Sequence, residues 1–132
     1  MRNARSLLCI AVVFWAGFDS TPTEAGNYST LQVTVSTTSR VVWGSLRGAR
    51  VSADLNQRLG CYATRSVTNG WSGGCYGVDA QGAVGSCYSL NDTDMAHAAL
   101  SVNAASNVYF TYNSSSQCTL IEVTQDSIYL AP

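Results

Sequence analysis

The sequence predicts an α+β domain, built mainly from antiparallel β-sheet with one α-helix and stapled by disulfides. Three observations predict this class. Apolar and polar residues alternate over most of the chain, which is typical of strands with one buried face. A stretch that begins at Asn91 has the capping residues and the apolar spacing of a helix. Four cysteines, Cys61, Cys75, Cys87 and Cys118, follow an export signal that contains the fifth, Cys9, and an even cysteine count in a small exported chain indicates disulfides.

Residues 1–25 are typical of a secretory signal peptide. Arg2 and Arg5 precede the apolar run 7–16, and Thr23-Glu24-Ala25 places small residues before a cleavage site. The apolar run is short for a membrane span, so we expect no stable span after cleavage. The alternative is an uncleaved N-terminal anchor. We therefore predict a signal peptide at 1–25 and a single secreted β-rich domain at 26–132, located outside the cell or in the periplasm.

Alternation predicts the first strands. Residues 31–36 form one strand pattern and residues 41–43 a second, and a turn follows at 44–48. A longer alternating stretch begins at residue 51 and points Leu59 and Cys61 inward, with Gln57 as the polar member of that buried face.

Turn, helix and hairpin signals order the rest of the chain. Asn69-Gly70 and residues 79–82 indicate two turns. Residues 91–94 offer N-cap oxygens to a helix that we expect to pack on one face of the sheet and to end near residue 106. A closing hairpin follows, with strands near 108–112 and 118–121 around the loop 113–116. Residues 128–130 add a short edge strand.

The turn centred on Gln81 places Cys75 opposite Cys87. A cross-strand disulfide fits there if the two residues form a non-hydrogen-bonded pair, in which side chains lie closest. We therefore predict Cys75–Cys87 and, by elimination, Cys61–Cys118. Four cysteines allow three pairings, and a rival that joins Cys61 to Cys75 across the Asn69-Gly70 turn stays open.

Each of three cysteines is followed by a tyrosine. Alternation then sends Tyr62, Tyr76 and Tyr88 to the face opposite the cysteines. With the nearby Trp71, these are the predicted ligand-binding residues, because exposed rings can stack on sugars or anchor a protein partner. The alternative is that the tyrosines form a second buried face, packed under the helix.

Charge and motifs argue against several functions. The chain has no lysine and a near-neutral net charge, so we expect no nucleic-acid partner. Asp94, His97 and Ser101 share a helix face, where side chains point outward in parallel with no oxyanion hole, so we expect no catalytic residue. The residues Asp92 and Asp94 are too few for calcium, and the cysteines lack close zinc-type pairs, so we expect neither metal nor cofactor.

The end of the chain, Val108-Tyr109-Phe110, Gln117-Cys118-Thr119 and residues 128–132, resembles small exported bacterial proteins of unknown function. The resemblance implies bacterial export and a disulfide-bonded β-rich domain, and it carries no activity.

Together these features predict a secreted, disulfide-stabilised binding or structural module that contacts an extracellular carbohydrate or protein surface. Two alternatives stay open. One is a small secreted inhibitor or toxin-like effector that presents the Asn69-Gly70 loop. The other is a small hydrolase that uses His97.

Overall fold

The computed structural model describes residues 30–125, so the predicted signal peptide and the predicted edge strand at 128–130 lie outside the described residues. The elements in chain order are β1 (Thr34–Ser36), β2 (Val41–Ser45), α1 (Leu46–Val51), β3 (Arg58–Ser66), β4 (Gly70–Val78), β5 (Val84–Leu90), α2 (Thr93–Leu100), β6 (Ser106–Tyr112) and β7 (Cys118–Gln125). Within this part of the chain, no helix is long and apolar enough to cross a membrane.

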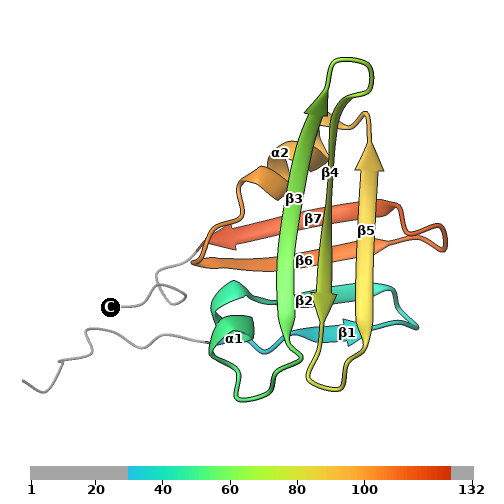
Figure 1. Ribbon diagram of the computed structural model, residues 1–132. Helices are drawn as coiled ribbons and strands as arrows, with labels where there is room; N and C mark the ends of the chain where they lie inside the picture. The colour runs from blue at the N-terminus through green and yellow to red at the C-terminus, as the bar shows by residue number, and fades with distance from the viewer. Residues whose placement is uncertain (1–29, 126–132) are drawn as a thin grey trace, which may run out of the picture.

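The strands form two antiparallel sheets. One sheet has the order β1-β2-β6-β7 and the other the order β3-β4-β5. The sheets pack face to face with their strands running across one another, and α2 lies beside β3, β4 and β7 (Figure 1). Crossed packing of this kind is one of the two common ways in which sheets share a core. The predicted fold class, mainly antiparallel sheet with helix and disulfides, is confirmed, although the structure has two short helices where the sequence predicted one.

The core lies between the sheets and depends on two glycines. Val42, Val108 and Phe110 of the four-stranded sheet are fully buried. A methyl group on Gly77 would lie 2.5 Å from Cγ1 of Val42, and one on Gly85 would overlap Cγ2. Since no side chain stands at either glycine, the valine of one sheet fits into a hollow in the other.

Helix α2 packs on the same inner face of the three-stranded sheet. Asp92 caps it, because its Oδ1 accepts a hydrogen bond of 3.0 Å from the N–H of Met95. Ala96 and Ala99 are buried, and Gly73 leaves room for the backbone of Ala96. The prediction that the helix continues to residue 106 is wrong.

The helix ends at Leu100 because the next residues turn back into β6. The N–H of Ser106 donates to the carbonyl of Asn103, and the N–H of Asn103 donates to Oγ of Ser106. The apolar spacing of α2 therefore extends beyond Leu100, although the hydrogen bonds change there from the helical pattern to a turn.

The segment from 44 to 57 also departs from expectation. Helix α1 replaces most of the predicted turn, since Oγ of Ser45 accepts a 2.8 Å hydrogen bond from the N–H of Gly48. The alternating stretch is not one strand: Leu55 is 93% exposed, and β3 begins only at Arg58. Gln57 is nevertheless buried as predicted. Its Oε1 accepts from the N–H of Val33, and its Nε2 donates to Asp54.

The disulfides are Cys61–Cys75 and Cys87–Cys118, so the predicted pairs Cys75–Cys87 and Cys61–Cys118 are wrong and the rival Cys61–Cys75 is correct. The predicted register is right, because Cys75 does face Cys87. However, Cys75 lies on the central strand and faces Cys61 as well. Their Cα atoms are 4.0 Å apart, which identifies the narrow, non-hydrogen-bonded pair.

In an antiparallel sheet the N–H and C=O of one residue point to the same neighbour. The backbone of Cys75 is therefore hydrogen-bonded to β5, and Cys75–Cys87 is the wide pair. Cys87 is left to bond Cys118 at the start of β7, which ties the two sheets together. The N–H of Tyr88 donates to the carbonyl of Ser116 beside this link.

Candidate functional site

Three exposed tyrosines lie on the outer face of the three-stranded sheet. Tyr62 on β3 and Tyr88 on β5 flank Gly74 in one cross-strand row. Tyr76 on β4 lies in the adjacent row, between Gly60 and Ser86. The exposed fractions of Tyr62, Tyr76 and Tyr88 are 49%, 44% and 39%. We call these three residues the tyrosine platform, and the prediction that they share one face is confirmed.

The rings of Tyr62 and Tyr76 lie over the sheet, each above a cross-strand glycine. A Cβ atom on Gly74 would lie 3.0 Å from the hydroxyl oxygen of Tyr62. One on Gly60 would lie 3.1 Å from Cε1 of Tyr76. An aromatic ring over a cross-strand glycine covers the backbone that the glycine leaves bare. These two rings thus lie low over the sheet, with one side toward the backbone and the other toward solvent.

The alternative, in which the tyrosines pack under the helix, is wrong. Cys75 and Cys87 on the inner face are 1% and 3% exposed, and α2 packs on that face beside Gly73. The inner face could accept the helix because its side chains are small there. The outer face is the one that stays open to solvent.

Trp71 does not belong to the tyrosine platform. It stands an even number of residues from Cys75 on β4 and therefore shares the inner face at the end of the sheet. Its ring meets that of His97 edge-on at 5.5 Å, and the guanidinium carbon of Arg65 lies 5.7 Å from the ring centroid. The predicted grouping of Trp71 with the tyrosines is corrected. Alternation along β4 already places Trp71 on the same face as Cys75.

The residues weighed for a hydrolase lie on or beside α2. Asp94 and His97 are exposed, and His97 contacts Trp71. Ser101 follows the helix, and its hydroxyl donates a 2.8 Å hydrogen bond to the carbonyl of Ala98. This serine hydroxyl is engaged by the helix backbone. Among residues 30–125, no group of three or more histidine, cysteine or acidic residues could hold a metal ion.

The Asn69-Gly70 loop is the tip of the long β3–β4 hairpin (Figure 1). Oγ of Ser66 accepts a hydrogen bond of 3.2 Å from the N–H of Thr68, so the turn is closed tightly. Val67 is fully exposed at this tip. The loop is therefore accessible, and it lies beyond the end of the tyrosine platform along the sheet.

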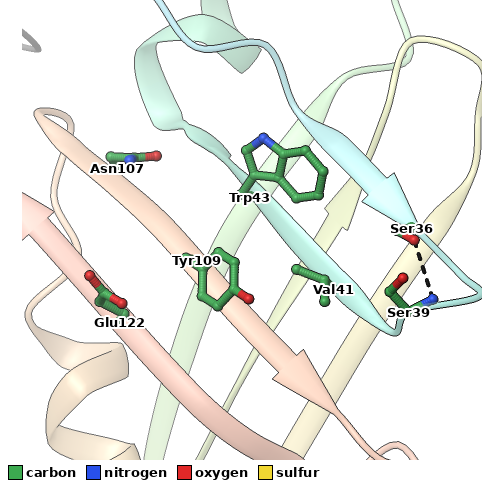
Figure 2. A pocket seen from close by; sticks show the side chains of 7 residues that line it. All are labelled: Ser36, Ser39, Val41, Trp43, Asn107, Tyr109 and Glu122. Atoms are coloured by element: carbon green, nitrogen blue, oxygen red, sulfur yellow. Dashed lines mark hydrogen bonds between the residues drawn. The ribbon is translucent and has the colours of Figure 1, made fainter.

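A second open site lies on the outer face of the other sheet, and sequence reasoning missed it. Trp43 on β2, Tyr109 on β6 and Glu122 on β7 form one cross-strand row. They line a groove of 620 Å³ with the further lining residues Ser36, Ser39, Val41 and Asn107 (Figure 2). We call it the Trp43 groove. Trp43 and Tyr109 are far apart in the sequence, and only the pairing of β2 with β6 brings them together.

Comparisons with known proteins add no relative: no protein-family model, curated protein or solved structure matches this chain.

Proposed function

We propose that this chain is an exported, disulfide-stapled binding module that holds sugar rings of an extracellular polysaccharide on the tyrosine platform. The observation that carries the proposal is the placement of Tyr62, Tyr76 and Tyr88 as exposed rings across one sheet face. A pyranose presents C–H groups on its faces, and the electron-rich face of an aromatic ring attracts such positively polarised hydrogens.

The positions between the rings favour a neutral ligand. The positions between and beside them are Gly60, Gly74 and Ser86, and none carries a charge. The row beyond Tyr62 and Tyr88 holds Thr64, Ser72 and Leu90, which add hydroxyl groups and an apolar side chain. The row beyond Tyr76 holds Arg58, Val78 and Val84, and Arg58 can donate hydrogen bonds to sugar hydroxyl groups at that edge of the platform. A polymer that is uncharged and rich in hydroxyl groups matches this composition. Because the platform is broad and shallow, it suits an extended chain rather than a single enclosed sugar.

The disulfides support both the rigidity of the platform and the export. Cys61, Cys75 and Cys87 each precede a platform tyrosine, so the crosslinks hold the backbone directly beneath the rings. Rigid presentation lowers the entropy that binding removes. Disulfides persist in oxidising compartments, which supports a secreted location.

A protein partner is less well matched to this face. A stable protein interface takes roughly 20–30 residues on each side. The tyrosine platform is three rings with glycine and serine between them, which is far fewer residues than such an interface takes. Three rings are sufficient for several consecutive sugars, so carbohydrate is the proposed ligand.

The proposal is tested by retention on insoluble cellulose, chitin and peptidoglycan, whose β-1,4-linked chains are extended. We expect the purified protein to bind at least one of them. The triple variant Tyr62→Ala, Tyr76→Ala and Tyr88→Ala should bind about a hundredfold more weakly, because each ring contact contributes roughly 1 kcal/mol.

Val67→Ala is the matched control, since it removes an exposed apolar side chain from the tip of the β3–β4 hairpin, outside the platform. It should bind like the unmodified protein. Retention of the triple variant at full strength would overturn the proposal. The same holds if the unmodified protein binds none of the three polymers. Loss of binding in Val67→Ala alone would favour the hairpin-tip effector instead. Urea unfolding of each variant checks that the fold is intact.

A further inference from the structure

The two ends of the Trp43 groove carry different side chains. Glu122 and Asn107 lie at one end, and Ser36 and Ser39 lie at the other (Figure 2). Between them stand the rings of Trp43 and Tyr109, which are direct cross-strand neighbours on β2 and β6. Trp43 is 38% exposed, so its ring is open to a ligand. The groove thus offers two aromatic rings beside one carboxylate.

The charge of the groove is purely negative. Among its lining residues, Glu122 is the one that is charged at neutral pH, and none of them is an arginine or histidine. The chain contains no lysine, so no lysine of its own can fill the groove. Arg40 adjoins Ser39 and Val41 in sequence, and these lie toward the end away from Glu122 (Figure 2). The carboxylate end is therefore open to an outside cation.

We infer that the Trp43 groove binds a quaternary ammonium cation carried by a small soluble molecule. The faces of tryptophan and tyrosine attract cations through the ring quadrupole, and tryptophan does so most strongly. The methyl groups of a quaternary ammonium also remove apolar ring surface from water. Glu122, next to Tyr109 in the same row, supplies the counter-charge.

A neutral ligand fits this groove less well. Covering Glu122 with an uncharged molecule would remove water from the carboxylate without replacing its interactions, which is unfavourable. A cation offsets that loss by direct attraction. This distinguishes the Trp43 groove from the tyrosine platform, which lies on the other sheet and has no charge between its rings. The two sites are independent, so the failure of one proposal leaves the other standing.

The test compares choline with 3,3-dimethylbutan-1-ol, a neutral molecule of the same shape. Each is titrated into the protein while the indole N–H resonance of Trp43 is followed by NMR, with the resonance assigned through Trp43→Phe. We expect choline to shift this resonance with a millimolar dissociation constant. The neutral isostere should bind at least tenfold more weakly, and added salt should weaken choline binding.

Two variants, each lacking one carboxylate, test whether the charge of Glu122 contributes to choline binding. Glu122→Gln should weaken choline binding by roughly fivefold, the factor that corresponds to an exposed ion pair. Asp94→Asn removes the same charge from α2 and should leave binding unchanged. Equal binding of choline and its isostere would overturn the inference. So would a Glu122→Gln variant that binds choline with unchanged affinity, or the absence of any shift at Trp43.

Discussion

The contact of Val42 with Gly77 and Gly85 gives a stability prediction that can be worked out from the structure. Val42→Ala removes two methyl groups from a fully buried position and should destabilise the protein by about 2 kcal/mol. Gly77→Ala alone should cost a similar amount, about 2 kcal/mol, because the added methyl would lie 2.5 Å from Cγ1 of Val42.

The two changes should not add when they are combined. In Val42→Ala/Gly77→Ala the new methyl occupies part of the space that the valine leaves, so the double variant should lose only about 1 kcal/mol. The coupling free energy between the two substitutions is then about 3 kcal/mol, because the double variant is more stable by that amount than the sum of the single costs. Adding Gly85→Ala returns the second methyl and should not lower the stability further.

The assay is urea unfolding with the disulfides intact, and the free energy of unfolding is obtained for each single and combined variant. The matched control pairs Val42→Ala with Gly73→Ala. A methyl on Gly73 would meet Ala96 of α2, and none of its nearest atoms belongs to Val42. Costs should be additive in that control. Additivity of Val42→Ala with Gly77→Ala would refute the packing of the valine into the glycine hollow.

Three other predictions concern the disulfide between the sheets, the helix cap and the response to acid. Replacing Cys87 and Cys118 together by alanine should lower the free energy of unfolding in urea by about 4 kcal/mol, because the disulfide closes a loop with a sequence separation of 31. A loss well below 1 kcal/mol would contradict this prediction. Asp92→Ala should cost about 1 kcal/mol in the same assay, while Asp92→Asn should retain most of the cap. The Gln57 side-chain hydrogen bond lowers the pKa of Asp54, so this carboxylate contributes stability above the ordinary aspartate pKa, and that contribution is lost as the pH falls through the lowered value. Comparison of unfolding midpoints from pH 6 to pH 2 should show a smaller acid-induced loss in Asp54→Asn, and identical pH profiles would contradict the assignment.

Much of the fold was predictable because the relevant signals are local. The turn around Gln81 set the register of Cys75 against Cys87, and the structure confirms it. Asp92 was recognised as a helix cap from its own side-chain chemistry. The position of the helix end was missed, because Ser106 closes a turn with Asn103 that apolar spacing does not reveal.

The disulfide pairing could not be obtained from register alone. Cys75 faces a cysteine on each side, and the choice depends on which neighbour receives its backbone hydrogen bonds. That alternation has no sequence signature. Once Cys75 bonds Cys61, the partner of Cys87 comes from the other sheet, and only the packing of the sheets brings Cys118 to it.

The candidate sites also differ in how far local sequence patterns predict them. The shared face of Tyr62, Tyr76 and Tyr88 follows from alternation along strands, so it was predictable. Their exposure depends on which face the helix covers, and Gly73 on the inner face leaves room there for Ala96 of α2. The Trp43 groove requires β2 to pair with β6, a long-range contact that no local pattern indicates.

NMR of the tyrosine side chains can show whether the tyrosine platform holds sugar rings. The protein with labelled tyrosine rings is titrated with cellohexaose and chitohexaose. We predict that the ring signals of Tyr62, Tyr76 and Tyr88 shift together with at least one of these sugars, while those of Tyr109 and Tyr112 stay in place. Unmoved ring signals of Tyr62, Tyr76 and Tyr88 at high concentrations of both sugars would exclude carbohydrate binding at the platform, as would shifts confined to Tyr109 and Tyr112.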